Sequence, residues 1–131
     1  MIQWDDSLST GLEHIDAQHK ELIENFNALS KVIFDPEGRE VAGDILDFLQ
    51  FYSSWHFERE EKCMDEYQCP VAAVNKQAHS DFLETFNQFY KQWWEEKMDA
   101  ALVEKTYQEL KNWIVEHIRG VDVQLKTCLP K

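Results

Sequence analysis

Proline and glycine are scarce in this sequence, with three prolines and four glycines among 131 residues. Because both residues populate turns and interrupt regular structure, their scarcity argues against a turn-rich β fold and favours long helices. Long apolar runs are absent too, since none approaches the roughly 18 residues that a membrane-spanning helix needs. We therefore expect no membrane insertion within this segment.

Positive charge is also in short supply. The 13 basic residues face 25 acidic ones, which gives a net charge of −12. A nucleic-acid-binding protein presents a basic face to phosphates, so this composition excludes that class and disfavours anionic membrane surfaces. The content of 44% hydrophobic and 29% charged residues predicts one globular domain over residues 1–131.

Cysteine is limited to an odd number of residues: Cys63, Cys69 and Cys128. An odd count without a CxxC motif argues against a disulfide framework and for a reducing compartment. The first residues lack the basic and apolar regions of a secretory signal. Together these features predict a cytoplasmic protein.

Four segments carry apolar residues at helical spacing, over residues 11–34, 40–67, 71–97 and 99–126. Ser9 or Thr10 is a candidate N-cap for the first segment, and Asp99 for the fourth. The short connections predict an all-α, up-down-up-down antiparallel four-helix bundle. Trp4 and Leu8 precede the first helix and are predicted to form an N-terminal arm across its end. The apolar face of the second helix is predicted from Val41, Ile45, Phe48, Leu49 and Tyr52.

Polar residues interrupt these apolar faces in every helix: His19, His56, Glu60, Asn75, His79 and His117. One histidine on a core face is usually a structural residue, but here each helix contributes one. A buried glutamate also requires a partner, because burying an unpaired carboxylate is costly. Imidazoles and carboxylates that converge from four helices are typical of a transition-metal site, and two carboxylates suit a dinuclear one.

The spacing of these residues supports such a site. His56 and Glu60 are four residues apart and project from one helix face, as do Asn75 and His79. His117 and Asp122 are five apart, which departs from the ideal face. Gly120 lies between them, and we expect it to let the backbone adjust, for example through a π-type turn.

Four segments then resemble, in order and spacing, the signature of the hemerythrin family: Gly11–His19, His56–Glu61, His79–Phe82 and His117–Asp122. The resemblance implies a four-helix bundle that holds two iron ions in an Fe–O–Fe or Fe–OH–Fe centre, with O2 or water as exogenous ligand. It also implies that His19 and His56 bind one iron, that His79 and His117 bind the other, and that Glu60 and Asp122 bridge them.

One position departs from this family, which has a second histidine four residues before the equivalent of His79. Here that position is Asn75. Three outcomes are open: water replaces the missing imidazole, the amide oxygen ligates weakly, or the site stays open. We expect an exogenous ligand there and fast autoxidation. His14 should face outward, and Cys63 is expected to pack in the core and not to ligate.

Six residues are predicted to wall the pocket around the metal ions: Ile15, Phe51, Trp55, Trp113, Ile114 and Ile118. An apolar wall limits the access of water and protons to the site.

Several functions fit this sequence. Hemerythrin domains of bacteria occur alone and fused to output modules such as chemotaxis receptors and diguanylate cyclases, so the resemblance implies an O2 or redox sensor that is not itself an enzyme. A fused or partner output domain would carry any catalytic activity. The alternatives are a reversible O2 carrier or store, a di-iron oxidase or peroxidase, and a plain or zinc-binding bundle. The oxidase is disfavoured because no glutamate lies three residues before a histidine.

Overall fold

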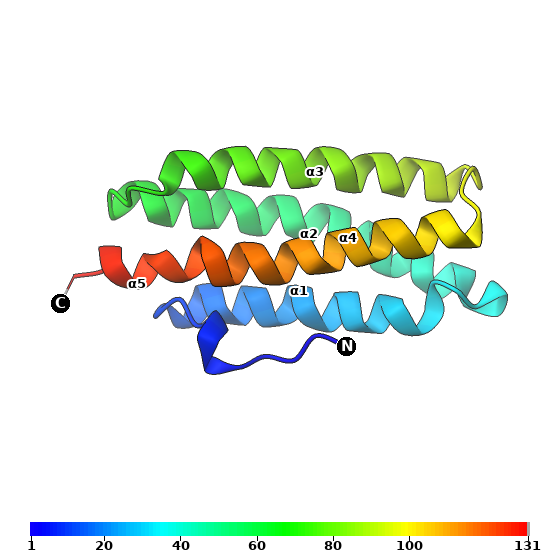
Figure 1. Ribbon diagram of the computed structural model, residues 1–131, viewed down its shortest axis with the longest axis horizontal. Coiled ribbons are helices and arrows are strands. Elements are labelled where there is room, and N and C mark those ends of the chain that lie inside the picture. Colours follow the sequence, from blue (N-terminus) through cyan, green and yellow to red (C-terminus); the bar gives the residue numbers. More distant parts are fainter. Residues whose placement is uncertain (131) are drawn as a thin grey trace.

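The computed structural model describes residues 1–130 and consists of four long helices, each antiparallel to the next (Figure 1). They are α1 (Glu13–Val32), α2 (Arg39–Glu66), α3 (Ala72–Trp94) and α4 (Ala100–Gly120). Each helix contacts its neighbours in sequence, and α4 returns to contact α1. The described residues contain no strand, so the predicted all-α bundle is confirmed.

The helix ends differ from the prediction by a few residues. Asp99 caps α4 as predicted, because its side chain accepts a hydrogen bond from the Leu102 amide. Neither Ser9 nor Thr10 caps α1, whose N-cap is Leu12. Thr10 instead donates both its amide and its hydroxyl to Asp16, each at 2.8 Å.

The fourth helix does not continue to residue 126. It ends at Gly120 and is followed by a 3-10 turn, η3 (Asp122–Gln124), and a short helix, α5 (Leu125–Cys128). The local adjustment after His117 is therefore a helix end and not the π-type turn suggested by the sequence. In Figure 1, α5 lies at the same end of the bundle as the connection between α2 and α3.

The α2–α3 connection begins with a compact helix stop. Gln68 adopts a left-handed conformation with φ of 52°, and the amide of Cys69 bonds the carbonyl of Met64 at 2.9 Å. This is the Schellman arrangement, in which the chain folds back on its own last turn. It fixes the backbone of Cys69 relative to α2.

The N-terminal arm lies along α1 and not across its end (Figure 1). Ile2 and Asn27 exchange two hydrogen bonds of 2.8 Å, and the Lys20 ammonium sits 4.9 Å from the centre of the Trp4 ring. Leu8, in the 3-10 turn η1 (Asp6–Leu8), is fully buried. The arm thus runs along the length of α1 and covers the part of the core beneath it.

The apolar interior is divided into two clusters of unequal size. The larger one fills most of the bundle and includes Phe26, Leu46, Phe82, Phe86 and Leu110. The smaller one lies at the α5 end and has four buried members: Ile15, Met64, Cys69 and Leu125. On α1 and α2, residues of the two clusters stand on opposite sides of His19 and Glu60, so a polar layer separates them.

Two expectations about packing were wrong. On α2, Val41 is 52% exposed and Phe48 37% exposed, whereas Ala42 and Leu46 are buried. The true apolar face is therefore rotated by one residue at this end of the helix.

The second correction concerns the cysteines, which were expected to stay unpaired. Cys69 and Cys128 form a disulfide with a Cα–Cα distance of 5.4 Å, while Cys63 is free. The two partners are 59 residues apart, and the fold brings them together because α5 returns to the α2–α3 connection.

Within residues 1–130, no helix is both long enough and apolar enough to cross a lipid bilayer.

Candidate metal centre

The structure brings all six predicted ligands together in the polar layer of the bundle. His19, His56, Glu60, His79, His117 and Asp122 are each at most 7% exposed. Their side chains form two groups that share Glu60, and within each group the possible ligand atoms lie within 4.8 Å of one another. One group contains His19, His56 and Glu60, and the other contains Glu60, His79, His117 and Asp122. This division is the one expected for two metal ions.

The two oxygens of Glu60 point to different groups. Oε2 lies 2.8 Å from His19 Nε2 and 3.3 Å from His56 Nε2. Oε1 lies 3.2 Å from His79 Nε2. A carboxylate in this position can bridge two ions, because each oxygen faces the imidazole nitrogens of a separate site.

Asp122 repeats this pattern from the other side. Its Oδ2 lies 3.1 Å from His19 Nε2, and its Oδ1 lies 3.1 Å from His117 Nε2. Asp122 reaches inward because α4 ends at Gly120 and the chain turns into η3. The helix end thus explains how two residues five apart in sequence meet at one site.

Asn75 contacts two members of the second group, Glu60 and His117. It is fully buried, and its Oδ1 lies 2.7 Å from His117 Nε2. Its Nδ2 donates to Glu60 Oε1 and to Met64 Sδ, both at 3.2 Å. The amide is therefore held on both sides, with its oxygen among the possible metal ligands.

The charges of this layer depend on close contacts, because solvent is excluded. Burial alone would lower the pKa of His19, but Asp122 and Glu60 outweigh this effect and raise that pKa to about 10. Burial dominates at His56 and lowers its pKa. Burial alone would raise the pKa of Glu60, but the three facing histidines hold that pKa well below its ordinary value. The site therefore favours an ionised Glu60 that faces positive charge.

The donor set fits two metal ions. Among the described residues, neither Glu60 nor Asp122 forms an ion pair with lysine or arginine. Several buried atoms also lack a hydrogen bond of acceptable geometry in this part of the chain, including His56 Nε2, His79 Nε2 and Asp122 Oδ1. Buried polar atoms without a partner are rare, and mixed imidazole and carboxylate donors suit iron. Metal ions would satisfy both the charge and these atoms.

Two polar residues outside the ligand set orient it. Gln18 Oε1 lies 2.6 Å from His56 Nδ1, and Glu61 Oε2 lies 3.2 Å from His79 Nδ1. A bond to the outer nitrogen directs Nε2 inward, which is common for histidines that bind metals. Neither residue was predicted from the sequence, although each directly adjoins a predicted ligand.

Aromatic rings close the site toward the larger cluster. Phe57 stacks on His79 with ring centres 3.9 Å apart, and Trp113 stacks on His117 at 4.3 Å. Phe57 is 3% exposed and was not predicted as a wall residue. Phe57 directly follows His56 in sequence. The predicted apolar face of α2 was rotated by one residue, so it did not include Phe57.

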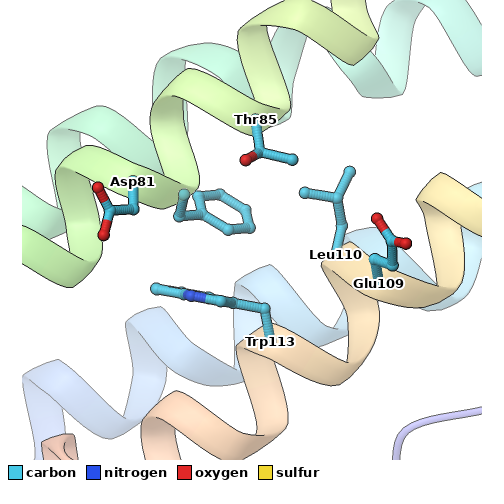
Figure 2. Close-up of a pocket in the computed structure, with 6 residues that line it drawn as sticks. Asp81, Thr85, Glu109, Leu110 and Trp113 are labelled. Atoms are coloured by element: carbon cyan, nitrogen blue, oxygen red, sulfur yellow. The ribbon is translucent and has the colours of Figure 1, made fainter.

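Figure 2 shows a cleft outside Trp113, between α3 and α4. Its volume is about 210 Å³, and its lining residues are Asp81, Phe82, Thr85, Glu109, Leu110 and Trp113. The rings of Phe82 and Trp113 lie 4.5 Å apart at the cleft. Trp113 also stacks on His117, so its indole ring touches both the cleft and a ligand of the second group.

The other predicted wall residues have different positions. Ile15, Ile114 and Ile118 are buried on the helices that carry His19 and His117, although their role as a wall remains a prediction. Phe51 is not part of a wall, because it is 66% exposed. Trp55 packs against Tyr52 and beneath the guanidinium of the exposed Arg59, so it lies on the outer side of α2.

His14 faces outward as predicted. It is exposed, and its Nε2 lies 3.6 Å from Cys63 Sγ. Cys63 is only partly buried and packs at the edge of the smaller cluster, while its neighbour Met64 is fully buried. Neither residue joins the two groups of possible ligands in the described chain.

Comparison with known proteins gives the same picture. A family model described as the hemerythrin HHE cation binding domain matches residues 10–129. A bacteriohemerythrin of Stenotrophomonas maltophilia is 31% identical over 122 residues, which cover 93% of this chain and 77% of that protein. A myohemerythrin of Theromyzon tessulatum is 27% identical over 124 residues, which cover 95% of this chain and 90% of that protein. A bacteriohemerythrin of Pseudomonas aeruginosa is 28% identical over 125 residues, which cover 92% of this chain and 76% of that protein.

Proposed function

Because this chain belongs to the hemerythrin family, we propose that it is a di-iron O2-binding domain that acts as an O2 or redox sensor. His19 and His56 would hold one iron, and His79 and His117 the other. Glu60 and Asp122 would bridge the two. When bound, the irons supply a redox-active centre at which O2 binds. The observation that carries this proposal is the division of the Glu60 oxygens between the two groups of histidines.

The chain's own residues orient the ligands and limit the access of water. Gln18 and Glu61 hold the outer nitrogens of His56 and His79. Phe57 and Trp113 cover the faces of two ligand rings. Electrostatic interactions are strong in such a dry, low-dielectric site, so the buried carboxylates favour bound cations.

The sensor role rests on Asn75. An amide is a weaker donor to iron than an imidazole, so the second iron keeps a position for water or O2. The cleft between α3 and α4 supports this idea, because Trp113, which lines it (Figure 2), also stacks on His117. Easier access to the second iron should speed autoxidation, which suits sensing better than carriage.

The domain itself would not be an enzyme. A redox change at the irons would alter the ligand layer, which touches all four long helices, and the helices would pass this change to a fused or partner output domain such as a diguanylate cyclase. Residues 117–128 are placed to take part, since they connect the ligand His117 to the end of α5.

Anaerobic purification, a metal count and optical spectra before and after exposure to air test this proposal. We expect two irons per chain, and conversion to the diferric form that is too fast for an oxygenated form to persist. An oxygenated form that lasts for hours would favour the O2 carrier and contradict the sensor. One zinc ion, or no metal, would reject the di-iron proposal altogether.

A further inference from the structure

We propose that the Cys69–Cys128 pair is a thiol–disulfide exchange site whose partner is a small dithiol, and that its redox state sets how firmly Asp122 is held in the metal centre. This inference rests on the proposed function only in its final step, the effect on bound metal. The first steps concern the chain alone.

Cys69 is the fixed partner of the pair. It is 5% exposed and belongs to the smaller apolar cluster. Its backbone amide bonds the carbonyl of Met64, which is fully buried in α2. The sulfur of Cys69 is therefore attached to a part of the bundle that cannot move without unwinding the end of α2.

Cys128 is the partner that can move. It is the last residue of α5, a helix of four residues. Helices this short are not stable alone, so contacts with the rest of the protein must hold α5 in place. Leu125 provides one such contact, because it is fully buried against the smaller cluster. The disulfide provides another, at the far end of α5.

Asp122 lies at the start of the same segment. It precedes Cys128 by six positions, and the backbone hydrogen bonds seen in the segment from η3 into α5 are short-range. Met64, which packs in the cluster beside Leu125, also accepts a hydrogen bond from Asn75. Loosening of α5 would therefore reach the metal centre by two routes, through the chain to Asp122 and through Met64 to Asn75.

The pair is open to exchange from one side. Cys128 is partly exposed, while Cys69 is buried. A thiolate of the dithiol attacks Sγ of Cys128, the S–S bond breaks, and Cys69 leaves as a thiolate. The second thiol of the reagent then closes a cyclic disulfide and releases Cys128. Two electrons and two protons pass from the dithiol to the pair, so the step is balanced.

Reduction removes a cross-link that closes a loop of 59 residues. Such a link stabilises the folded state mainly because it restricts the unfolded chain. Here it also restricts the local opening of α5. We expect the reduced protein to keep its four long helices but to open more often at residues 121–129, with weaker retention of metal.

The first test counts thiols in the folded metal-free chain by alkylation and mass spectrometry. Before dithiothreitol treatment we expect one free thiol, that of Cys63. After treatment we expect three free thiols. The Cys63→Ser variant should show none before and two after. Three free thiols in the air-oxidised wild type would overturn the proposal.

The second test measures amide hydrogen exchange of residues 121–129 in the metal-free chain. Reduction should speed exchange there in the wild type and in Cys63→Ser, while the middle of α2 stays protected. The Cys128→Ser variant should exchange fast under both conditions. Equal exchange before and after reduction in the wild type would contradict the coupling.

The last test follows the loss of iron to a chelator. Reduction should make release several-fold faster in the wild type and in Cys63→Ser, and should leave Cys128→Ser unchanged. If the chain binds no iron, the proposed function fails while the thiol and exchange results still decide the first part of this inference. If two irons bind but reduction does not alter their release, the effect on Asp122 is wrong and the proposed function stands.

Discussion

Asn75 Oδ1 and His117 Nε2 lie 2.7 Å apart in the interior of the bundle. The amide links α3 to α4 inside the ligand layer, at the position where the family resemblance predicted a second histidine. Because Asn75 also donates to Glu60 and Met64, its side chain cannot swing away without breaking three buried contacts. The substitution therefore leaves a well-defined polar group in the second site and not merely a space.

Replacement of Asn75 by histidine tests its effect on the second iron. Asn75→His should bind two irons and convert to the diferric form more slowly than the wild type, because the added imidazole occupies the open position. Stopped-flow optical spectra after mixing the reduced protein with O2 measure this rate. Asn75→Ala, which lacks both donor and acceptor, is the control and should not slow the reaction. Equal rates in Asn75→His and the wild type would show that Asn75 does not control access.

Removal of the charge on Glu60 should abolish the dinuclear site. Glu60→Gln keeps the shape but loses a bridging carboxylate that faces three imidazoles. Loss of a residue that only hydrogen-bonds to a metal ligand typically lowers metal affinity about 10- to 100-fold. We expect Glu60→Gln to lower iron affinity by more than this. Isothermal titration with Fe(II) under anaerobic conditions gives both stoichiometry and affinity. Retention of two tightly bound irons would rule out a bridging role for Glu60.

Gln18 offers a milder change at the same site. Gln18→Leu removes the 2.6 Å contact to His56 Nδ1 and should lower iron affinity by about 10- to 100-fold, because the imidazole loses its orientation. The exposed Gln77, which contacts Asp81 and no predicted ligand, provides the matched control Gln77→Leu. The affinity of the control should equal that of the wild type, and an equal loss in both variants would mean that Gln18 acts only through general stability.

Phe57 and Phe51 test the corrected position of the pocket wall. Phe57→Ala removes a buried ring that stacks on His79 and should lower the free energy of unfolding by about 3–5 kcal/mol. Phe51→Ala, at a position 66% exposed, should change it by no more than about 0.5 kcal/mol. Urea unfolding of both variants measures the difference, and a large loss in Phe51→Ala would contradict its outward position.

Trp113 is the expected barrier between the α3–α4 cleft and the second site. Trp113→Ala should speed the binding of azide to the diferric protein, because it removes the ring between the cleft and His117. Trp113→Phe keeps an aromatic ring and should bind azide at a rate closer to that of the wild type. Stopped-flow absorbance records these rates, and if neither variant differs from the wild type, small ligands reach the irons by another path.

The sequence was sufficient for the bundle and for the ligand set because both depend on helical periodicity. His19, His56, His79 and His117 each occupy a core position of a different helix, and antiparallel packing brings such positions to one level. Asp122 needed the extra information of a helix end, which Gly120 only suggested. The family resemblance then supplied the pairing of ligands with each iron, which periodicity alone does not give.

The remaining errors arose where the sequence pattern has more than one reading. On α2, Val41 and Phe48 are apolar but exposed, while Ala42 is small and buried, so hydrophobicity alone placed the face incorrectly. The same error led to Phe51 instead of Phe57. The Cys69–Cys128 pair depends on where α5 returns in space, and no local pattern reports a contact between residues that are 59 positions apart.

Because the polar layer separates two apolar clusters, we expect it also to divide the protein into two units that can unfold separately. The smaller apolar cluster has only four buried members, and the residues that pack against them are partly buried ones at the same end of the bundle. When the layer holds metal ions, bonds from all four helices join both sides, and calorimetry should record one transition. Without metal ions, only contacts among the polar side chains hold the layer together, and we expect the α5 end to melt first. Metal loading would then determine whether this bundle behaves as one body or as two.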